Sequence, residues 1–250
     1  MIRLMEQTRR PHLLSEEAKN RLKQVSTATL TSQLLNRGFR NTFIPNLTPL
    51  RPDLRLVGYA FTLRYVPARE DFGVDYDNDT NVQRLAVEAV GPEDVLVIDA
   101  RGDTRAASLG HILATRLWKR GAAGLVTDGG LRDTPAFRNL DLPTYTRAPH
   151  ATTSSVIHHP VDMNVPIGCG GVLVMPGDVI VGDAEGVVVI PSAVAEEVAA
   201  DAYEQEILEA FILQKIKAGS SIKGVYPPNE ETYREFILAN QMSKSSQQGD

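Results

Sequence analysis

The dipeptide Arg132-Asp133 carries two different groups that together suit chemistry at a 2-oxo acid. Arginine presents a planar fork of donors that matches a carboxylate, and aspartate offers a hard oxygen ligand for a divalent cation. The pair follows a predicted buried strand, Leu125 to Thr127, and two glycines, Gly129 and Gly130, that permit close approach of the backbone. The alternative is a surface ion pair on a tight turn, which is the usual role of such a dipeptide.

A second candidate is the segment SLGHILA, Ser108 to Ala114. We expect it to begin a helix, and the free N–H groups of a first helical turn form an anion site. An ordinary helix start is the alternative, but together with Arg132 the segment would set an amide cradle beside a guanidinium. His111 within it is either a structural or exposed residue or a side chain that points near the site.

The other polar groups have simpler interpretations. The acidic segment Arg69 to Asn81 has aspartates at alternate positions, but it lacks the glycine and the glutamate that a calcium loop requires, so we interpret it as a solvated loop. His158 and His159 have no metal-ligating partner at a suitable spacing, and we interpret them as loop residues. Cys169 has no base beside it and is interpreted as a core or turn thiol.

The elements that would position Arg132 and Asp133 form a β-α-β unit. Val95 to Asp99 is predicted to be a buried strand, apolar residues at helical spacing follow up to Gly121, and Leu125 to Thr127 is the next strand. The polar residues after each strand then lie at the carboxyl ends of parallel strands. Ligands of open α/β sheets collect at that edge.

The flanking segments are predicted from the same patterns. Residues 1–14 are expected to form an irregular arm and residues 243–250 a frayed polar tail. The elements expected between them are a helix capped by Ser15, a helix over 25–38, a strand over 56–65, strands over 172–175, 179–182 and 187–190, a long helix over 192–217 and a short helix over 230–239.

Composition excludes several classes of function. The chain has 250 residues, 42% of them hydrophobic, which is enough for a sizeable core. A net charge of -5 argues against nucleic-acid binding, and no apolar run is long enough for a membrane span or a signal peptide. The single cysteine fits a reducing compartment. We therefore expect a soluble, cytoplasmic protein that binds neither nucleic acid nor membranes.

Three stretches, taken together, resemble the RraA-like group of proteins over roughly residues 25 to 210. They are ASLGHILATRLWKRGAAGLVTDGGLRD, LPTY and PIGCGGVLVMPGDVIVGDAEGVVVIP. The group includes class II, metal-dependent 4-hydroxy-4-methyl-2-oxoglutarate/4-carboxy-4-hydroxy-2-oxoadipate aldolases and regulators of ribonuclease E activity. The resemblance implies an α/β fold, a swivelling β/β/α domain over 25–217 with an N-terminal arm and helix over 1–24 and a C-terminal extension over 218–250. It also implies a homotrimer or homohexamer with active sites at subunit interfaces.

The same resemblance implies roles for individual residues. The backbone amides expected to contact the substrate belong to Gly110, His111, Ile112 and Leu113. Arg132 would bind the substrate, and Asp133 would hold Mg²⁺ or Mn²⁺, largely through water. A glutamate from the long helix of a neighbouring subunit would also approach the metal, and Glu206 or Glu204 is its match in this chain.

Two positions depart from the family pattern. His111 stands where the family has Gly or Asp, and Ala136 stands where an acidic residue usually follows the metal-holding Asp. These departures, with the acidic loop at 69–81, indicate a subgroup with its own substrate, for which 2-oxo acids derived from sugar acids are candidates. The ribonuclease regulators tend to lose the metal-holding Asp, and this chain keeps Asp133, which favours an enzyme.

The resulting hypothesis is a metal-dependent lyase that cleaves a 2-oxo acid by a retro-aldol reaction and releases pyruvate. The same enolate chemistry predicts oxaloacetate decarboxylation as a side activity. Two alternatives remain open: a non-catalytic protein that inhibits a ribonuclease by contact, and a metal-dependent dehydratase of hydroxy or sugar acids on the same scaffold.

Overall fold

The computed structural model describes residues 13–73, 75 and 77–246. Most of the expected N-terminal arm and the last four residues of the expected tail lie outside these residues. The described chain forms two compact units that divide after Ala200. The first unit contains sheets covered by helices, which confirms the expected α/β class.

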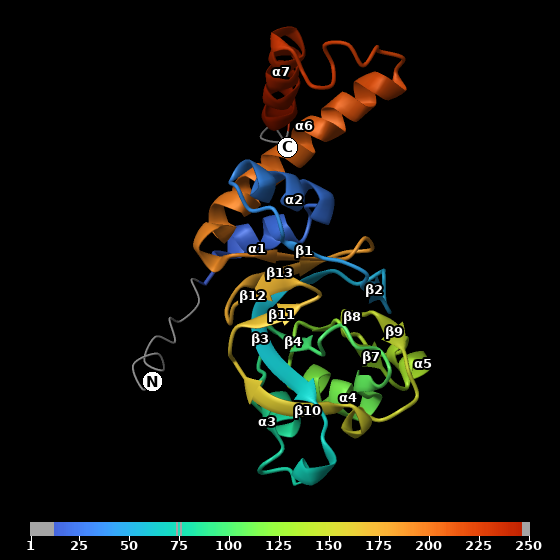
Figure 1. Cartoon of the computed structure of the whole chain (residues 1–250). Coiled ribbons are helices and arrows are strands. Elements are labelled where there is room, and N and C mark those ends of the chain that lie inside the picture. The colour runs from blue at the N-terminus through green and yellow to red at the C-terminus, as the bar shows by residue number, and fades with distance from the viewer. Residues whose placement is uncertain (1–12, 74, 76, 247–250) are drawn as a thin grey trace. The chain divides into compact units, whose positions relative to one another are not determined.

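The first unit is built on a sheet of nine strands in which parallel and antiparallel pairing meet at the long strand β3 (Figure 1). The β3, β4, β6 and β8 strands run parallel, whereas β1, β14, β13, β10 and β2 pair in antiparallel fashion. The order is β1 (Phe43–Ile44), β14 (Val187–Ile190), β13 (Val179–Gly182), β3 (Leu56–Pro67), β4 (Asp94–Asp99), β6 (Gly124–Thr127), β8 (Thr144–Thr146) and β2 (Thr48–Pro49), and β10 (His158–Met163) also pairs with β3. The parallel strands predicted at 95–99 and 125–127 are thus confirmed.

Alternate residues of β4 face two separate cores, because successive side chains of a strand point to opposite faces. Leu96 and Ile98 pack in the core shared with helices α3 (Val82–Ala89) and α4 (His111–Lys119). Val95 and Val97 point to the opposite face and belong to a second core, which is shared with the hairpin of β11 (Ile167–Cys169) and β12 (Val172–Val174). The sheet is therefore buried on both faces at its centre.

A small parallel sheet departs from the sequence-based expectation. It consists of β5 (Ala107–Leu109), β7 (Gly130–Leu131) and β9 (Ala148–Pro149). Ser108 and Leu109 were predicted to lie in the helix, but they belong to β5, and α4 begins only after its N-cap residue, Gly110. The physical reason is that Ser108 and Leu109 are buried and pair with β7, which places the helix start one residue after the strand.

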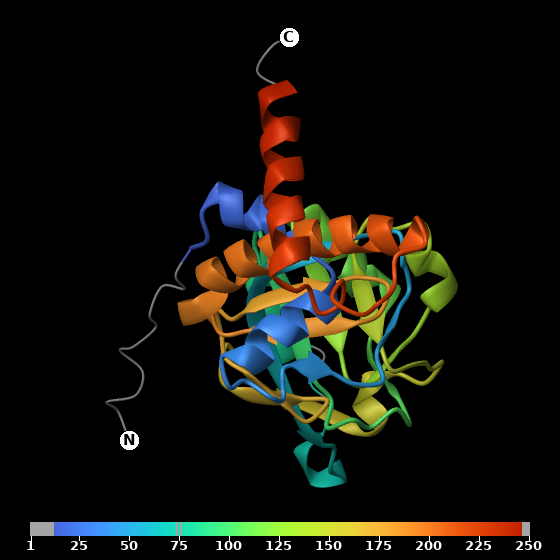
Figure 2. The same cartoon turned by 90° about the horizontal axis from the view of Figure 1, so that it is seen from above.

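The helices α1 (Glu16–Leu22) and α2 (Thr27–Asn36) cover the part of the sheet that contains β14 (Figure 1). The predicted cap is confirmed, since the Ser15 hydroxyl accepts a hydrogen bond from the backbone N–H of Ala18 at 3.1 Å. In the second helix Ser26 caps Thr29 in the same way. Figure 2 shows the short 3₁₀ helix Glu70–Phe72, which lies between β3 and α3, projecting from the rest of the unit.

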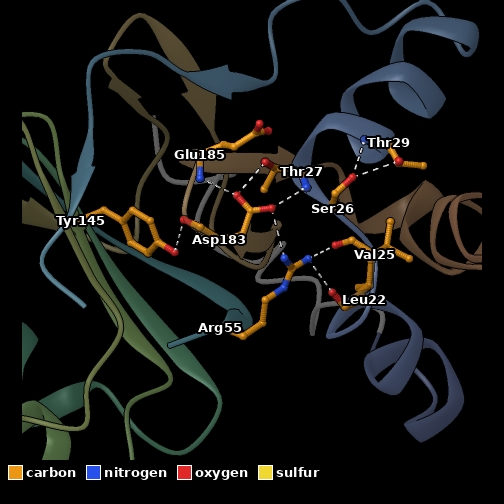
Figure 3. A network of polar contacts seen from close by, with 9 residues as sticks. All are labelled: Leu22, Val25, Ser26, Thr27, Thr29, Arg55, Tyr145, Asp183 and Glu185. Atoms are coloured by element: carbon orange, nitrogen blue, oxygen red, sulfur yellow. Dashed lines mark hydrogen bonds and ion pairs between the residues drawn. The ribbon is translucent and has the colours of Figure 1, made fainter. Parts of the chain in front are cut away.

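The α1–α2 junction is attached to the sheet through the carboxylate of Asp183, in the turn between β13 and β14 (Figure 3). Asp183 accepts hydrogen bonds from the backbone N–H and hydroxyl of Thr27, at 2.8 and 2.9 Å, and pairs with Arg55 at 3.2 Å. Arg55 also donates to the carbonyls of Leu22 and Val25. One carboxylate and one guanidinium thus tie the two helices to the sheet.

The second unit contains the long helix that was predicted from its apolar spacing, α6 (Ala195–Lys217), from Asp201 onward, and α7 (Glu230–Ser246). Within this unit the rings of Phe211 and Phe236 contact each other in a tilted arrangement with centroids 5.6 Å apart, and Lys215 pairs with Glu235. The terminal helix continues to Ser246, past its predicted end at residue 239. Each helix in the described part of the chain is too short or too polar to cross a lipid bilayer.

Replacement of Asp183 by Asn is expected to lower the free energy of unfolding by about 2 kcal/mol, because Arg55 loses its counter-charge and one acceptor becomes a donor. Burial alone would raise the pKa of the Asp183 carboxyl, but the hydrogen bonds from Thr27 and Glu185 and the charge of Arg55 lower it below its ordinary value of 3.8. A lowered pKa stabilises the fold above that ordinary value, and this stabilisation is lost as the pH falls through the folded-state pKa.

Urea unfolding of wild type and Asp183→Asn at pH 7 and at pH 3 measures this effect. The difference between the two proteins in the free energy of unfolding should be about 2 kcal/mol at pH 7 and smaller at pH 3. Glu185→Gln, an exposed change in the same turn, is the matched control and should stay within about 0.5 kcal/mol of wild type. An equal effect of the two substitutions would contradict the role given to Asp183.

Candidate active site

A pocket of about 880 Å³ opens in the first unit beside the N-terminal end of α4. This volume is typical of small-molecule sites, which span roughly 300 to 1,000 Å³. Its wall is completed by α3, β10 and the 3₁₀ helix η2 (Ser154–Val156). Five of the residues predicted for the site line it: Gly110, Ile112, Leu113, Arg132 and Asp133.

The register of the small sheet brings the two predicted segments together. Leu109 at the end of β5 pairs with Leu131 at the end of β7, and the N–H of Arg132 donates to the carbonyl of Leu109 at 3.1 Å. A Cβ added to Gly110 would lie 2.9 Å from Cγ of Arg132 and 3.2 Å from Oδ2 of Asp133. Only glycine therefore permits these two side chains to cross the start of α4.

The charges of the site are close together but still accessible. Oδ2 of Asp133 lies 3.5 Å from Nε of Arg132 and accepts a hydrogen bond from the N–H of His111 at 3.4 Å. The Arg132 and Asp133 side chains remain 43% and 48% exposed. The ion pair that we considered as the alternative is therefore present, and both groups keep surface for a ligand. A carboxylate at this helix end is also stabilised by the helix dipole.

His111 contributes its backbone rather than its ring. The imidazole packs edge-on against Phe137, with centroids 5.7 Å apart, and lies 3.4 Å from the hydroxyl of Thr115. The pocket wall does not include His111, but it does include the neighbouring residue Ile112, which is 82% exposed. The interpretation that the His111 side chain points near the site is not supported by this geometry. Ala136 lies in the following short helix, Thr134–Phe137.

Asp128 is a structural residue whose role the sequence analysis missed. Its buried carboxylate accepts three backbone N–H bonds, from Ala100 at 2.7 Å, Gly102 at 2.8 Å and Gly170 at 2.9 Å. Burial raises the pKa of this carboxyl, and the three hydrogen bonds partly oppose that rise. The sequence does carry a signal for this role, because Asp128 stands between a predicted buried strand and two glycines. Asp128 holds the loops after β4 and β11 at the end of β6.

His158 was interpreted as a loop residue, but it lies on β10 and is buried. Its ring stacks on Tyr65 at 5.4 Å between centroids, and Nδ1 lies 3.1 Å from a guanidinium nitrogen of Arg101. Burial, followed by the positive charge of Arg101, lowers the pKa of His158. The imidazole forms part of the pocket wall next to η2.

The acidic loop at 69–81 also reaches the pocket, through Asp75, Asn78 and Thr80. Two of its carboxylates are occupied within the loop: Asp75 accepts from the N–H of Asp77 at 2.9 Å and from the Thr80 hydroxyl at 2.7 Å, and Asp77 accepts from the N–H of Asp79 at 2.8 Å. The Thr80 bond in particular lowers the pKa of Asp75. Such turns are the ordinary use of aspartate in a solvated loop.

Within the described residues, no three His, Cys, Asp or Glu side chains are grouped as a metal site. Cys169 is a buried core thiol, as expected, and burial raises its pKa. The half-exposed carboxylate of Asp133 suits a magnesium-like ion, which binds through one or two carboxylates and otherwise keeps water and substrate oxygens. Glu206 belongs to the second unit, and its predicted role stays a prediction.

Comparison with known proteins identifies relatives of this fold. A Halalkalibacterium halodurans protein with the provisional name 4-hydroxy-4-methyl-2-oxoglutarate aldolase is 40% identical over 159 residues, which cover 62% of this chain and 70% of that protein. A Pseudomonas syringae pv. tomato crystal structure, of a protein described as uncharacterized, superposes with a TM-score of 0.72 at 26% identity, over 85% of this chain and 98% of that chain.

A crystal structure of Streptomyces coelicolor RraAS2 superposes with a TM-score of 0.71 at 33% identity, over 79% of this chain and 96% of that chain. RraAS2 is described as an unusual member of the RNase ES inhibitor RraA protein family. The sequence profile of the RraA-like proteins, described as Aldolase/RraA, matches residues 27–189, which is more than half of the chain. This chain is therefore a member of the Aldolase/RraA family.

Proposed function

We propose that this protein is a divalent-metal-dependent lyase that cleaves a 4-hydroxy-2-oxo acid to pyruvate and a second carbonyl compound. The observation that carries the proposal is the meeting of Arg132, Asp133 and the N-terminal end of α4 at one pocket. Aldolase names among the relatives support the same reaction type. Oxaloacetate decarboxylation is proposed as a side activity, because it passes through the same pyruvate enolate.

Each residue of the site has a chemical task in this proposal. The guanidinium of Arg132 would bind the 2-oxo acid and share the negative charge that develops on it. The backbone N–H groups at the start of α4, over 110–113, would hold the substrate carboxylate. Asp133 would hold Mg²⁺ or Mn²⁺, which when bound supplies electrophilic stabilisation of the enolate charge.

The reaction balances without a further co-reactant. The bond between C3 and C4 breaks, its electron pair moves to C3, and the hydroxyl proton of C4 leaves as that carbon becomes a carbonyl. A proton added at C3 then completes pyruvate. We propose that the protein acts as a homotrimer or homohexamer in which Glu206, or Glu204, of a neighbouring subunit also approaches the metal.

A second function is supported by the similarity to RraAS2, which belongs to a ribonuclease inhibitor family by its description. In that case the protein would act by contact with a ribonuclease. Such a role needs neither a metal nor the carboxylate of Asp133. Metal dependence and the response to substitution at this position therefore separate the two functions.

The direct test is release of pyruvate from 4-hydroxy-4-methyl-2-oxoglutarate and from oxaloacetate, followed with a coupled lactate dehydrogenase. We expect pyruvate in the presence of Mg²⁺ or Mn²⁺ and its loss after treatment with EDTA, with recovery when the metal is returned. Absence of metal-dependent pyruvate from both substrates would overturn the proposal.

Asp133→Asn and Arg132→Lys are expected to lower kcat/KM for oxaloacetate by roughly 100-fold each. Asparagine removes the negative charge while keeping the shape, and lysine keeps the charge while losing the two-pronged geometry. Both side chains are partly exposed, so the melting temperature should change little. Arg138→Lys, at an exposed position in the same segment, is the matched control and should keep full activity. Full activity of both site variants would remove these residues from the mechanism.

Gly110→Ala tests the close approach itself. The added methyl group would displace the Arg132 side chain, since its Cγ lies only 2.9 Å from the new atom. We expect a loss of activity of roughly 10-fold or more with a nearly unchanged melting temperature, because the backbone of Gly110 is in an extended conformation that alanine also adopts. Gly168→Ala, whose new methyl group meets open space, is the control. Equal activities of the two variants would show that the approach is unimportant.

A further inference from the structure

The pocket is lined by uncharged polar side chains of two kinds. Those of the acidic loop and α3 already have partners within the protein. Thr80 donates to Asp75 at 2.7 Å, and Asn78 accepts from Arg84. The amide of Asn81 donates to the Asp75 carbonyl at 2.8 Å. These groups, like the amide of Gln83 that binds the Tyr65 hydroxyl at 2.7 Å, serve the fold.

The second kind is a row of three hydroxyls at η2, from Thr153, Ser154 and Ser155, all of which line the pocket. None of the three side chains has a hydrogen-bond partner among the described residues. Thr153 occupies the N-cap position of η2, where a hydroxyl usually binds a backbone N–H, yet it makes no such bond. Ser154 and Ser155 are only partly exposed. The row is therefore free for a ligand.

The backbone fixes these hydroxyls relative to the proposed catalytic pair. The Thr152 carbonyl accepts from the N–H of Ala107 on β5 at 3.0 Å, and the N–H of His150 donates to Leu131 at 2.9 Å. The segment that leads into η2 is thus attached to the same small sheet whose strands end at Gly110 and Arg132. A molecule that occupies the pocket meets charged groups at one part of the wall and hydroxyls at another.

Resting on the lyase function proposed above, we infer that the substrate is a polyhydroxylated 4-hydroxy-2-oxo acid, of the 3-deoxy-2-oxo sugar-acid class. Its carboxylate and oxo group bind at Arg132 and the start of α4, and the hydroxyls beyond C4 bind Thr153, Ser154 and Ser155. Cleavage between C3 and C4 gives pyruvate and a hydroxyaldehyde, with the C4 hydroxyl proton lost and a proton gained at C3.

Hydroxyls without a partner in the protein favour a substrate that carries hydroxyl groups over one that carries an apolar chain. When an apolar chain displaces water from a hydroxyl, that group loses its hydrogen bonds without replacement, which costs binding energy. A substrate hydroxyl restores the bond. Sites built in this way discriminate against analogues that lack the group. The hydroxyl row thus favours a sugar-acid chain over a methyl-bearing chain.

The test compares two six-carbon acids with the same reacting core. One is 4,5,6-trihydroxy-2-oxohexanoate, and the other is 4-hydroxy-2-oxohexanoate, which lacks the last two hydroxyls. Pyruvate release with Mn²⁺ gives kcat/KM for each, and oxaloacetate serves as a short substrate that does not need the hydroxyl row. The variants are Ser154→Ala/Ser155→Ala and, as a control hydroxyl outside this pocket, Ser32→Ala.

For wild type we expect the trihydroxy acid to have a kcat/KM roughly 10-fold higher than its deoxy analogue. In Ser154→Ala/Ser155→Ala this ratio should fall towards one, while oxaloacetate decarboxylation stays within about twofold, and Ser32→Ala should keep the wild-type ratio. A wild-type ratio of one or less, or a ratio unchanged in the double variant, would overturn the inference while pyruvate release leaves the lyase function standing. Failure of all three substrates would remove both.

Discussion

The site depends on one buried carboxylate at the carboxyl end of the parallel strands. Asp128 accepts three backbone N–H bonds, from Ala100 and Gly102 in one segment of the chain and from Gly170 in another. These bonds fix the loops after β4 and β11 against the end of β6. Two residues after Asp128 the chain enters β7, which begins at Gly130, so the position of Arg132 follows from this fixed point.

Two negatively charged groups, the Asp133 carboxylate and the proposed substrate carboxylate, would share the start of α4. Asp133 already occupies the favourable potential at the start of α4, where it accepts the N–H of His111. A substrate carboxylate arriving at the same helix end would meet this negative charge at short range. The guanidinium of Arg132 offsets part of that repulsion, and a divalent cation on Asp133 would offset the rest. In the proposed function, binding of the substrate anion and of the cation would therefore be coupled at this position.

Much of the fold could be predicted from residue patterns, because strands such as β4 and β13 contain enough consecutive branched residues to be recognised. The short strands β5 and β7 could not be predicted, since two or three residues are too few to show a period. β10 was missed because Pro160 lies in it, and it is tolerated there at a break in register with β3.

The location of the candidate residues could be predicted where it depends on segments that are neighbours in sequence. Arg132 and Asp133 follow a recognisable strand, and the helix start at 110–113 lies close to them as expected. The edge-on packing of His111 and the burial of His158 depend on contacts with Phe137 and Tyr65, which lie far along the chain and leave no local signal. The position of the η2 hydroxyls at the pocket could not be predicted for the same reason, because no local sequence signal indicates it.

The bond between Thr27 and Asp183 joins residues 156 positions apart. During synthesis at roughly 5–20 residues per second, α2 must therefore wait on the order of 10 s before its partner in the β13–β14 turn leaves the ribosome. In that interval the apolar side chains of Leu22, Leu30 and Leu34, which are fully buried in the finished fold, have no sheet to cover them. The emerging N-terminal helices therefore keep these apolar side chains without their final packing partners until the β13–β14 turn has been made.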